Sequence, residues 1–188
     1  MFAGHFGVAA IVKARHPEVP LWALLTATQL PDLAFLPLTV AGVESIESTG
    51  YGKAVIDAMY THSLLGALLL SLIAGLAAAK AWGKRSGIVV GAVAFSHWLL
   101  DLLVHRPDLP IVPGNIGGFP LLGLGLWNIP AASAAVEAVL VLSGAVLYWR
   151  SVHRRGNSSP HRWKAHASGA AMAIVLCLSL LSDIMGGN

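Results

Sequence analysis

Residues 87–104 read GIVVGAVAFSHWLLDLLV, an apolar run in which an imidazole, His97, and a carboxylate, Asp101, stand about one helical turn apart. The run has about the length needed to cross the hydrocarbon core of a bilayer, roughly 20 residues. A charged group at that depth is costly, about 2.5–3.5 kcal/mol for a central Asp, and it is tolerated where a partner compensates it. The segment therefore predicts both a membrane span and a polar site within it.

The whole chain has the composition of an integral membrane protein. Of its 188 residues, 56% are hydrophobic and 11% are charged, and the mean hydropathy is +0.71, whereas about 25% of residues are charged in an average soluble protein. The segments that are apolar and long enough to cross, or nearly cross, a bilayer are 20–41, 62–79, 87–104, 129–149 and 167–186. Residues 2–12 are too short for a full crossing and predict a half-span helix, and Pro31 predicts a kink or break in the first long segment.

These segments predict an all-α fold, a polytopic membrane helical bundle with about five spanning helices and a short N-terminal helix. We expect one integral membrane domain over residues 1–188, with a motif-bearing core at 1–105 and C-terminal helices at 129–149 and 167–186. The Gly- and Pro-rich residues 105–128 predict an irregular connection, and a re-entrant loop is one form that it could take.

The basic residues are distributed unevenly along the chain. Ten of the twelve Lys and Arg residues fall within 13–19, 80–86 and 150–166. The positive-inside rule predicts that these three segments are cytoplasmic and that 42–61 and 105–128 lie outside. A pI near 9.3 then reflects topology and contact with membrane lipids, and we expect no nucleic-acid partner.

Polar residues within the spans gather between mid-membrane and the outer surface. At about 1.5 Å per residue, His97 lies about 15 Å and Asp101 about 21 Å from the cytoplasmic edge, and Asp32 about 16 Å. His5 lies about 12 Å from that edge, and His62 begins its helix at the outer end. Gathered around a divalent cation, such carboxylates stay ionised and such imidazoles stay neutral, which makes their burial tolerable.

Each of these residues also has a purely structural interpretation. His97 and Asp101, at i and i+4, offer two ligands from one helix face, or they form a hydrogen-bonded pair that pins two helices. His62 lies within a Thr-His-Ser sequence typical of a helix N-cap, and Asp32 is placed to cap a broken helix. Glu137, about 10 Å below the outer edge, has either a site role or a helix–helix hydrogen bond.

Four motifs occur in order along the first part of the chain: Gly4-His5, Leu30-Pro31-Asp32, THSLL at 61–65 and SHWLLD at 96–101. Together they resemble the YdjM family of inner-membrane-associated metal-dependent hydrolases, over about the first 105 residues. The resemblance implies a bacterial inner-membrane protein with metal ligands at His5, Asp32, His62, His97 and Asp101. Ala34 stands where the family often has a second acid, and residues 58–60 lack its usual His-Arg pair, which argues against a two-metal site.

The residue types predict the chemistry that such a site supports. Histidines and carboxylates without a thiolate suit Zn²⁺ best, with Mn²⁺ or Fe²⁺ as alternatives. An ion with an open position would acidify a bound water. Asp32 or Glu137 would then serve as general base or would orient a metal ligand. His105 and Arg106 stand at the expected mouth, as candidates for substrate binding.

We therefore expect a metal-dependent hydrolase that acts on a lipid or lipid-linked (phospho)ester through a metal-activated water. One alternative is a non-catalytic membrane protein in which the His/Asp cluster is a structural metal site or joins helices. Another is a metal or proton transporter, which needs polar residues along a path to both faces. The inner halves of the spans carry few such residues, which argues against transport.

Overall fold

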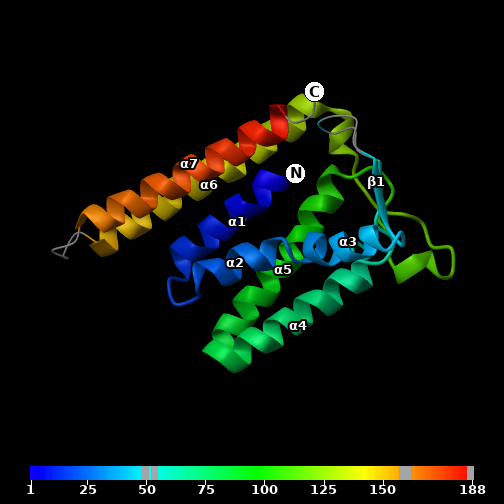
Figure 1. Cartoon of the computed structure of the whole chain (residues 1–188), viewed down its shortest axis with the longest axis horizontal. Coiled ribbons are helices and arrows are strands. Elements are labelled where there is room, and N and C mark those ends of the chain that lie inside the picture. The colour runs from blue at the N-terminus through cyan, green and yellow to red at the C-terminus, as the bar shows by residue number, and fades with distance from the viewer. Residues whose placement is uncertain (48–50, 52–54, 157–161, 186–188) are drawn as a thin grey trace.

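The computed structural model describes residues 1–47, 51, 55–156 and 162–185. Helices dominate this part of the chain, and the two strands form one small hairpin (Figure 1). In chain order the elements are α1 (Phe2–Arg15), α2 (Leu21–Thr28), α3 (Leu30–Val40), β1 (Ser45–Glu47), β2 (Val55–Asp57), α4 (Leu64–Trp82), α5 (Lys84–Val104), the short 3₁₀ turns η1 (Pro113–Asn115) and η2 (Leu126–Asn128), α6 (Pro130–Gly156) and α7 (Arg162–Met185). The expected all-α bundle is confirmed.

Among the described residues, four helices are individually long and apolar enough to cross a membrane: α4, α5, α6 and α7. The α2–α3 pair passes the same test together and is bent by 53° at Gln29. The break therefore lies two residues before Pro31, which takes its place in the first turn of α3, where its missing N–H costs nothing. The protein is a multi-pass membrane protein, and its described residues contain four candidate spans, or five if the bent pair is one span.

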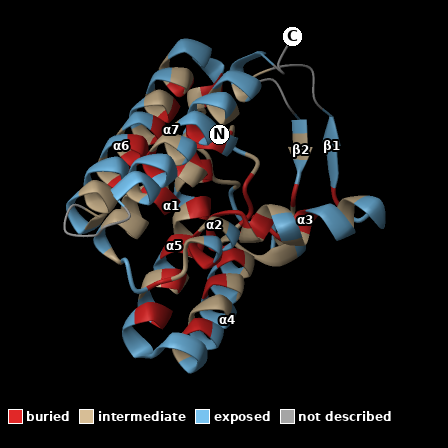
Figure 2. Ribbon diagram, turned by 60° about the vertical axis from the view of Figure 1, so that its left-hand side comes forward, coloured by how far each residue is buried: buried red, intermediate tan, exposed pale blue. Residues whose placement is uncertain are grey.

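Helix α1 is the predicted short N-terminal helix, and it lies inside the bundle. It has 14 residues and is about 21 Å long, which is too short to cross the bilayer core alone. Buried residues concentrate where α1, α2 and α5 meet, whereas α4, α6 and α7 expose much of their outer surface (Figure 2). Exposed leucines such as Leu69, Leu72 and Leu76 cover the outer face of α4, as expected for a surface in contact with lipid.

Glycines allow the helices to approach closely. A Cβ atom on Gly7 of α1 would lie 2.7 Å from the Leu140 carbonyl oxygen of α6, and one on Gly144 would lie 2.6 Å from the Gly7 carbonyl oxygen. A Cβ atom on Gly87 of α5 would likewise lie 2.6 Å from the carbonyl oxygen of Gly75 in α4. The small-residue run near Gly75 therefore serves packing within the chain.

The predicted basic segments meet at one end of the bundle. The Ser151 hydroxyl donates to the Ala14 carbonyl at 2.8 Å, and the Trp22 and Trp82 rings meet edge to face at 5.5 Å. The β hairpin and the 105–128 connection lie at the opposite end (Figure 1). The grouping that the positive-inside argument requires is thus present in the fold.

Some boundaries differ from those predicted. The expected loop 80–86 is a one-residue turn, because Gly83 adopts a φ of 88° that lets α4 and α5 follow each other directly. Much of 150–166 is helical, since α6 continues to Gly156 and α7 begins at Arg162. The β1–β2 hairpin within 42–61 was not predicted, whereas the irregular path of 105–128 was, and Leu109 and Leu122 form an isolated bridge there.

Candidate metal centre

The structure brings together five residues from distant parts of the chain. His5 comes from α1, Asp32 from the first turn of α3, His62 from the turn before α4, and His97 and Asp101 from α5. Two overlapping groups present ligand atoms that lie within 4.8 Å of one another: His5, His97 and Asp101, and Asp32, His62 and His97. All five of the sequence-predicted ligand residues therefore lie around one point.

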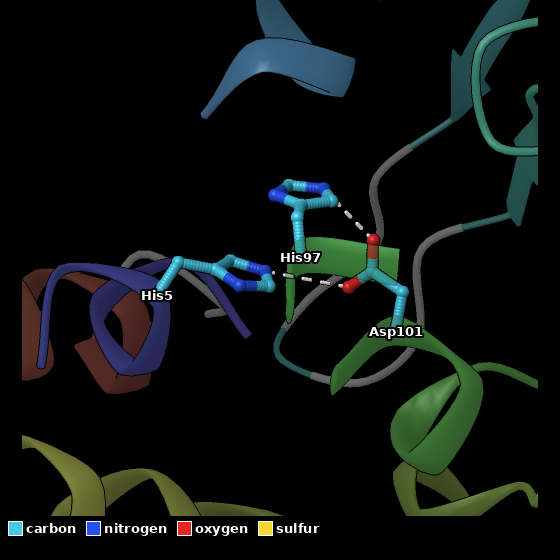
Figure 3. A group of neighbouring side chains, drawn as sticks. All are labelled: His5, His97 and Asp101. Atoms are coloured by element: carbon cyan, nitrogen blue, oxygen red, sulfur yellow. Dashed lines mark ion pairs between the residues drawn. The ribbon is translucent and has the colours of Figure 1, made fainter. Parts of the chain in front are cut away.

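Asp101 is at the centre of the first group (Figure 3). Its Oδ1 lies 3.4 Å from His5 Nε2, and its Oδ2 lies 2.9 Å from His97 Nε2. The His5 and His97 rings are stacked, with centroids 4.0 Å apart. The i, i+4 spacing on α5 thus places His97 and Asp101 side by side, and α1 adds the third side chain.

His62 and Asp32 complete the cluster. His62 Nε2 lies 3.3 Å from Asp32 Oδ1, 3.4 Å from His97 Nε2 and 3.6 Å from Asp101 Oδ2. Four ligands at about 2.0–2.1 Å from a tetrahedral ion are separated by roughly 3.3–3.4 Å. The spacings in the cluster are close to those of a metal coordination shell.

The segment around His62 forms the predicted helix N-cap and also brings the imidazole to the cluster. Ser63 is the N-cap of α4, and its hydroxyl accepts from the Gly66 amide at 3.0 Å. His62, which precedes it, is 4% exposed and points its Nε2 into the cluster. The cap fixes the turn that aims the imidazole.

Backbone and side-chain acceptors fix the protonation of two imidazoles. His97 Nδ1 lies 2.6 Å from the Thr28 carbonyl oxygen, which only accepts, so Nδ1 carries a proton. In the neutral form of this imidazole, Nε2 then keeps the lone pair. Thr28 is the last residue of α2, and its carbonyl lies beside the break that positions α3. Such a contact to the outer nitrogen is typical of a metal-binding histidine.

Glu44 orients His62 through Thr61, and sequence reasoning missed it. The Thr61 hydroxyl donates to Glu44 Oε2 at 2.8 Å, so its oxygen is left to accept from His62 Nδ1 at 2.9 Å. Glu44 is 2% exposed, and its Oε1 also accepts the backbone amides of Tyr60 and Thr61 at 2.7 and 3.0 Å. The relay places the proton of His62 on Nδ1 and its lone pair on Nε2.

With these proton positions, the cluster contains two carboxylates and no positive charge to balance them. When both imidazoles are neutral, the Nε2 lone pairs of His62 and His97 face each other and the carboxylates of Asp32 and Asp101. Atoms that only accept repel one another when they are buried, so the group needs either a bound cation or additional protons on its imidazoles. A divalent ion satisfies all of them at once.

The cluster forms one side of a cavity of about 410 Å³. His97 and Asp101 are 1% and 5% exposed in their side chains, whereas Asp32 is 39% exposed. Asp32 is therefore the carboxylate that faces the open side. Apolar side chains form most of the remaining wall: Met1, Phe2, Phe35, Leu36, Ile46, Ile56 and Trp127.

His105 lines this cavity, as expected for a residue at the mouth. Its Nδ1 lies 2.9 Å from Asp108 Oδ1, and its ring lies 4.3 Å from the Trp127 ring between centroids. Arg106 is not among the lining residues, so the structure brings only one of the two predicted substrate-binding residues to the cavity.

Glu137 is near the cluster in depth but does not line the cavity. Its side chain is fully buried and accepts from the Gly4 amide at 3.1 Å and the Tyr51 hydroxyl at 2.9 Å. Asp183 accepts from the neighbouring Ala3 amide at 2.8 Å. Burial, reinforced by the nearby Glu137 charge, raises the pKa of Tyr51, so the phenol remains a donor. Glu137 thus caps the amino end of α1, one residue before His5.

The three histidines are not held equally. His97 and His62 have acceptors for their outer nitrogens. Within the described part of the chain, His5 Nδ1 is buried without a hydrogen-bond partner. A histidine is a weaker metal ligand when its other ring nitrogen makes no hydrogen bond, so His5 is expected to contribute least to ion binding.

The hydrogen-bond relay from Glu44 through Thr61 to His62 predicts that metal affinity depends on the Glu44 carboxylate. Glu44→Gln keeps the shape but places an amide donor toward Thr61, so that the hydroxyl turns to donate to His62 Nδ1 and moves the imidazole proton to Nε2. We expect metal affinity, measured by competition with a chromophoric chelator, to fall roughly 10–100-fold. Glu47→Gln, at an exposed position in β1, is the matched control and leaves the affinity unchanged. An affinity that is unaltered in Glu44→Gln, with normal melting behaviour, would exclude the relay.

Comparisons with protein-family models, curated proteins and solved structures returned no match for this chain. The resemblance to the YdjM family therefore stays an expectation based on four short motifs. The functional assignment depends on the chain's own residues and on how the fold arranges them.

Proposed function

We propose that this protein is a membrane-embedded, metal-dependent hydrolase that acts on a lipid or lipid-linked (phospho)ester. The observation that carries the proposal is the convergence of imidazole Nε2 atoms and carboxylate oxygens, 2.9–3.6 Å apart, at the wall of a cavity. A buried group of acceptors with an accessible side is the arrangement that catalytic metal sites require.

The donor set favours Zn²⁺, with Mn²⁺ or Fe²⁺ as alternatives, because it offers nitrogen and oxygen and no thiolate. The only cysteine, Cys177, is exposed on α7 and is not part of the cluster. His62 and His97 are buried and have hydrogen-bond partners for their Nδ1 atoms, and the buried Asp101 lies within 3.6 Å of both, so these three would form the core of the ligand set. His5 would complete it, and Asp32 borders it on the accessible side.

An ion held there would supply an acidified water as nucleophile and would polarise the ester oxygen. Asp32, on the accessible side, is placed to accept the proton of the attacking water. His105 has its Nδ1 engaged by Asp108, which leaves Nε2 as the nitrogen available for an anionic oxygen of the substrate. The mostly apolar wall limits competition from bulk water.

The cavity walls support an amphipathic substrate. Phe35, Leu36, Ile46, Ile56 and Trp127 offer apolar surface directly beside the charged cluster. The volume lies within the range of about 300–1,000 Å³ that is usual for small-molecule sites. A lipid headgroup with part of its chains satisfies both regions, and membrane lipids are the molecules at hand at this depth.

We place the protein in a bacterial inner membrane, with the basic end of the bundle in the cytoplasm and the cavity toward the outer leaflet. The clustering of basic segments at one end supports this orientation through the positive-inside rule. Labelling of single engineered cysteines in intact cells tests it, since a residue beside the hairpin would react with an impermeant reagent and one beside Gly83 would not.

The function is tested with purified protein in detergent or nanodiscs and fluorogenic phosphodiester and carboxylic-ester lipids. We expect hydrolysis that is abolished by chelation and restored by Zn²⁺, Mn²⁺ or Fe²⁺. Stoichiometric metal without turnover across these esters would instead support a structural metal site. Metal flux into proteoliposomes would favour transport.

A further inference from the structure

A second cavity lies at the basic end of the bundle, away from the metal centre. It has a volume of about 360 Å³ and is formed between the carboxyl ends of α1 and α6. Its wall consists of four arginines, Arg15, Arg150, Arg154 and Arg155, together with Ala14, Leu147 and Ser151. The hydrogen bond from the Ser151 hydroxyl to the Ala14 carbonyl fixes the two helices beside it.

The four arginines beside this cavity have no acidic ion-pair partner among the described residues. No carboxylate lines it, and across the residues that the structure describes no ion pair joins any of the four arginines to an acid. Glu18, an acid at the same end, instead contacts His16 at 3.2 Å and Arg85 at 3.9 Å. The four arginines are exposed side chains that carry like charges beside one volume, so a bound anion would stabilise the arrangement.

We propose that this cavity binds a phosphate group, supplied by the headgroup of an anionic phospholipid of the adjacent leaflet. Guanidinium groups match the oxygens of a phosphate through paired, charge-assisted hydrogen bonds. Trp22 and Trp82, in contact at the same end, mark the depth at which headgroups lie. The apolar side chain of Leu147 at the wall suits the neighbouring glycerol and acyl region.

The arrangement goes beyond a general excess of positive charge at a cytoplasmic end. Arg15 and the three arginines of α6 are more than a hundred residues apart in the chain and yet line one cavity. Other basic residues at the same end, including Arg162 and Lys164 of α7, do not line it. Two pairs of residues with equal charge and different placement are thus available for comparison, and the proposal is independent of the hydrolase function.

The test measures binding of short-chain phosphatidylglycerol to the full chain in a zwitterionic detergent, by native mass spectrometry or titration calorimetry. We expect the dissociation constant to rise about fivefold for each arginine removed, hence about 25-fold in the double variant Arg150→Gln/Arg154→Gln. The double variant Arg162→Gln/Lys164→Gln has the same net charge as Arg150→Gln/Arg154→Gln, and its dissociation constant should differ from that of the wild type by less than twofold. Melting curves check the fold, and Arg15→Gln, on the other helix, provides an independent variant.

The same binding measurements are repeated with inorganic phosphate in place of the lipid. If phosphate alone binds with the same sensitivity to Arg150 and Arg154, the cavity is a phosphate site supplied from solution, and the proposed ligand chemistry stands without the lipid. Equal loss of lipid binding in both double variants would show non-specific attraction and overturn the proposal. Binding that is unchanged in Arg150→Gln/Arg154→Gln and in Arg15→Gln would also overturn it.

Discussion

His97→Ala is expected to abolish stoichiometric metal binding in the purified protein and, with it, metal-dependent hydrolysis. His97 belongs to both ligand groups, and its Nε2 lies 2.9 Å from Asp101, 3.4 Å from His62 and 3.6 Å from Asp32. The loss of affinity should exceed the roughly 10–100-fold that follows removal of a residue behind a ligand. Elemental analysis of metal per chain, and titration with Co²⁺ as a spectroscopic probe, measure it.

His153→Ala is the matched control, because this histidine lies on α6 and contacts His166 with ring centroids 4.8 Å apart, outside the cluster. It should retain metal and activity. His5→Ala should lose less affinity than His97→Ala, since His5 Nδ1 has no partner among the described residues. Wild-type metal content in His97→Ala would contradict the assignment.

Asp32→Asn is expected to reduce kcat by roughly 10²–10⁴-fold, the usual contribution of a general base. Most of the metal should remain bound, because His62, His97 and Asp101 are still in place. The reason is position: the Asp32 side chain is 39% exposed and borders the cavity, whereas the Asp101 side chain is 5% exposed. The rise of kcat with pH that reports deprotonation of the general base should also disappear in this variant.

Asp57→Asn, on the exposed strand β2, is the control for removing a carboxylate at the same end of the molecule. It should leave both kcat and metal content unchanged. If Asp32→Asn lost metal as completely as His97→Ala, Asp32 would be an essential ligand and the base would have to be sought elsewhere. Normal turnover in Asp32→Asn would remove it from the reaction altogether.

Much of the fold could be predicted because the bilayer restricts it. The length and hydropathy of the spans, the positions of the basic segments and the break before Pro31 follow from rules that need no tertiary information. The same holds for the pairing of His97 with Asp101, which the i, i+4 spacing on one helix determines. Boundaries at Gly83 and Gly156 were less predictable, since helices extend past the apolar core into the interface.

The sequence predicted how deep each site residue lies in the membrane, but only in part which neighbours its side chain faces. Distance along a span places a residue between the two membrane surfaces, but it does not say which neighbour the side chain faces. Glu137 illustrates this, because it has a depth comparable to the cluster and yet points at the Gly4 amide and the Tyr51 hydroxyl. Its contacts are those of a cap for α1, which helps to position His5.

Glu44 was missed for a different reason. It lies in the polar segment after α3, outside the spans, where a carboxylate is unremarkable by composition. In the folded chain Glu44 is buried and accepts a hydrogen bond from the Thr61 hydroxyl. The signal that could have suggested an orienting group was the hydroxyl of Thr61 directly beside His62, because a metal-binding imidazole needs an acceptor for its other nitrogen.

The claim that one ion is held among these side chains is tested most directly by X-ray absorption spectroscopy of protein loaded with one equivalent of Zn²⁺. The arrangement predicts nitrogen and oxygen ligands at about 2.0–2.1 Å, with outer-shell scattering from more than one imidazole. A spectrum of a hydrated ion without imidazole scattering, or failure to retain one ion per chain, would contradict it.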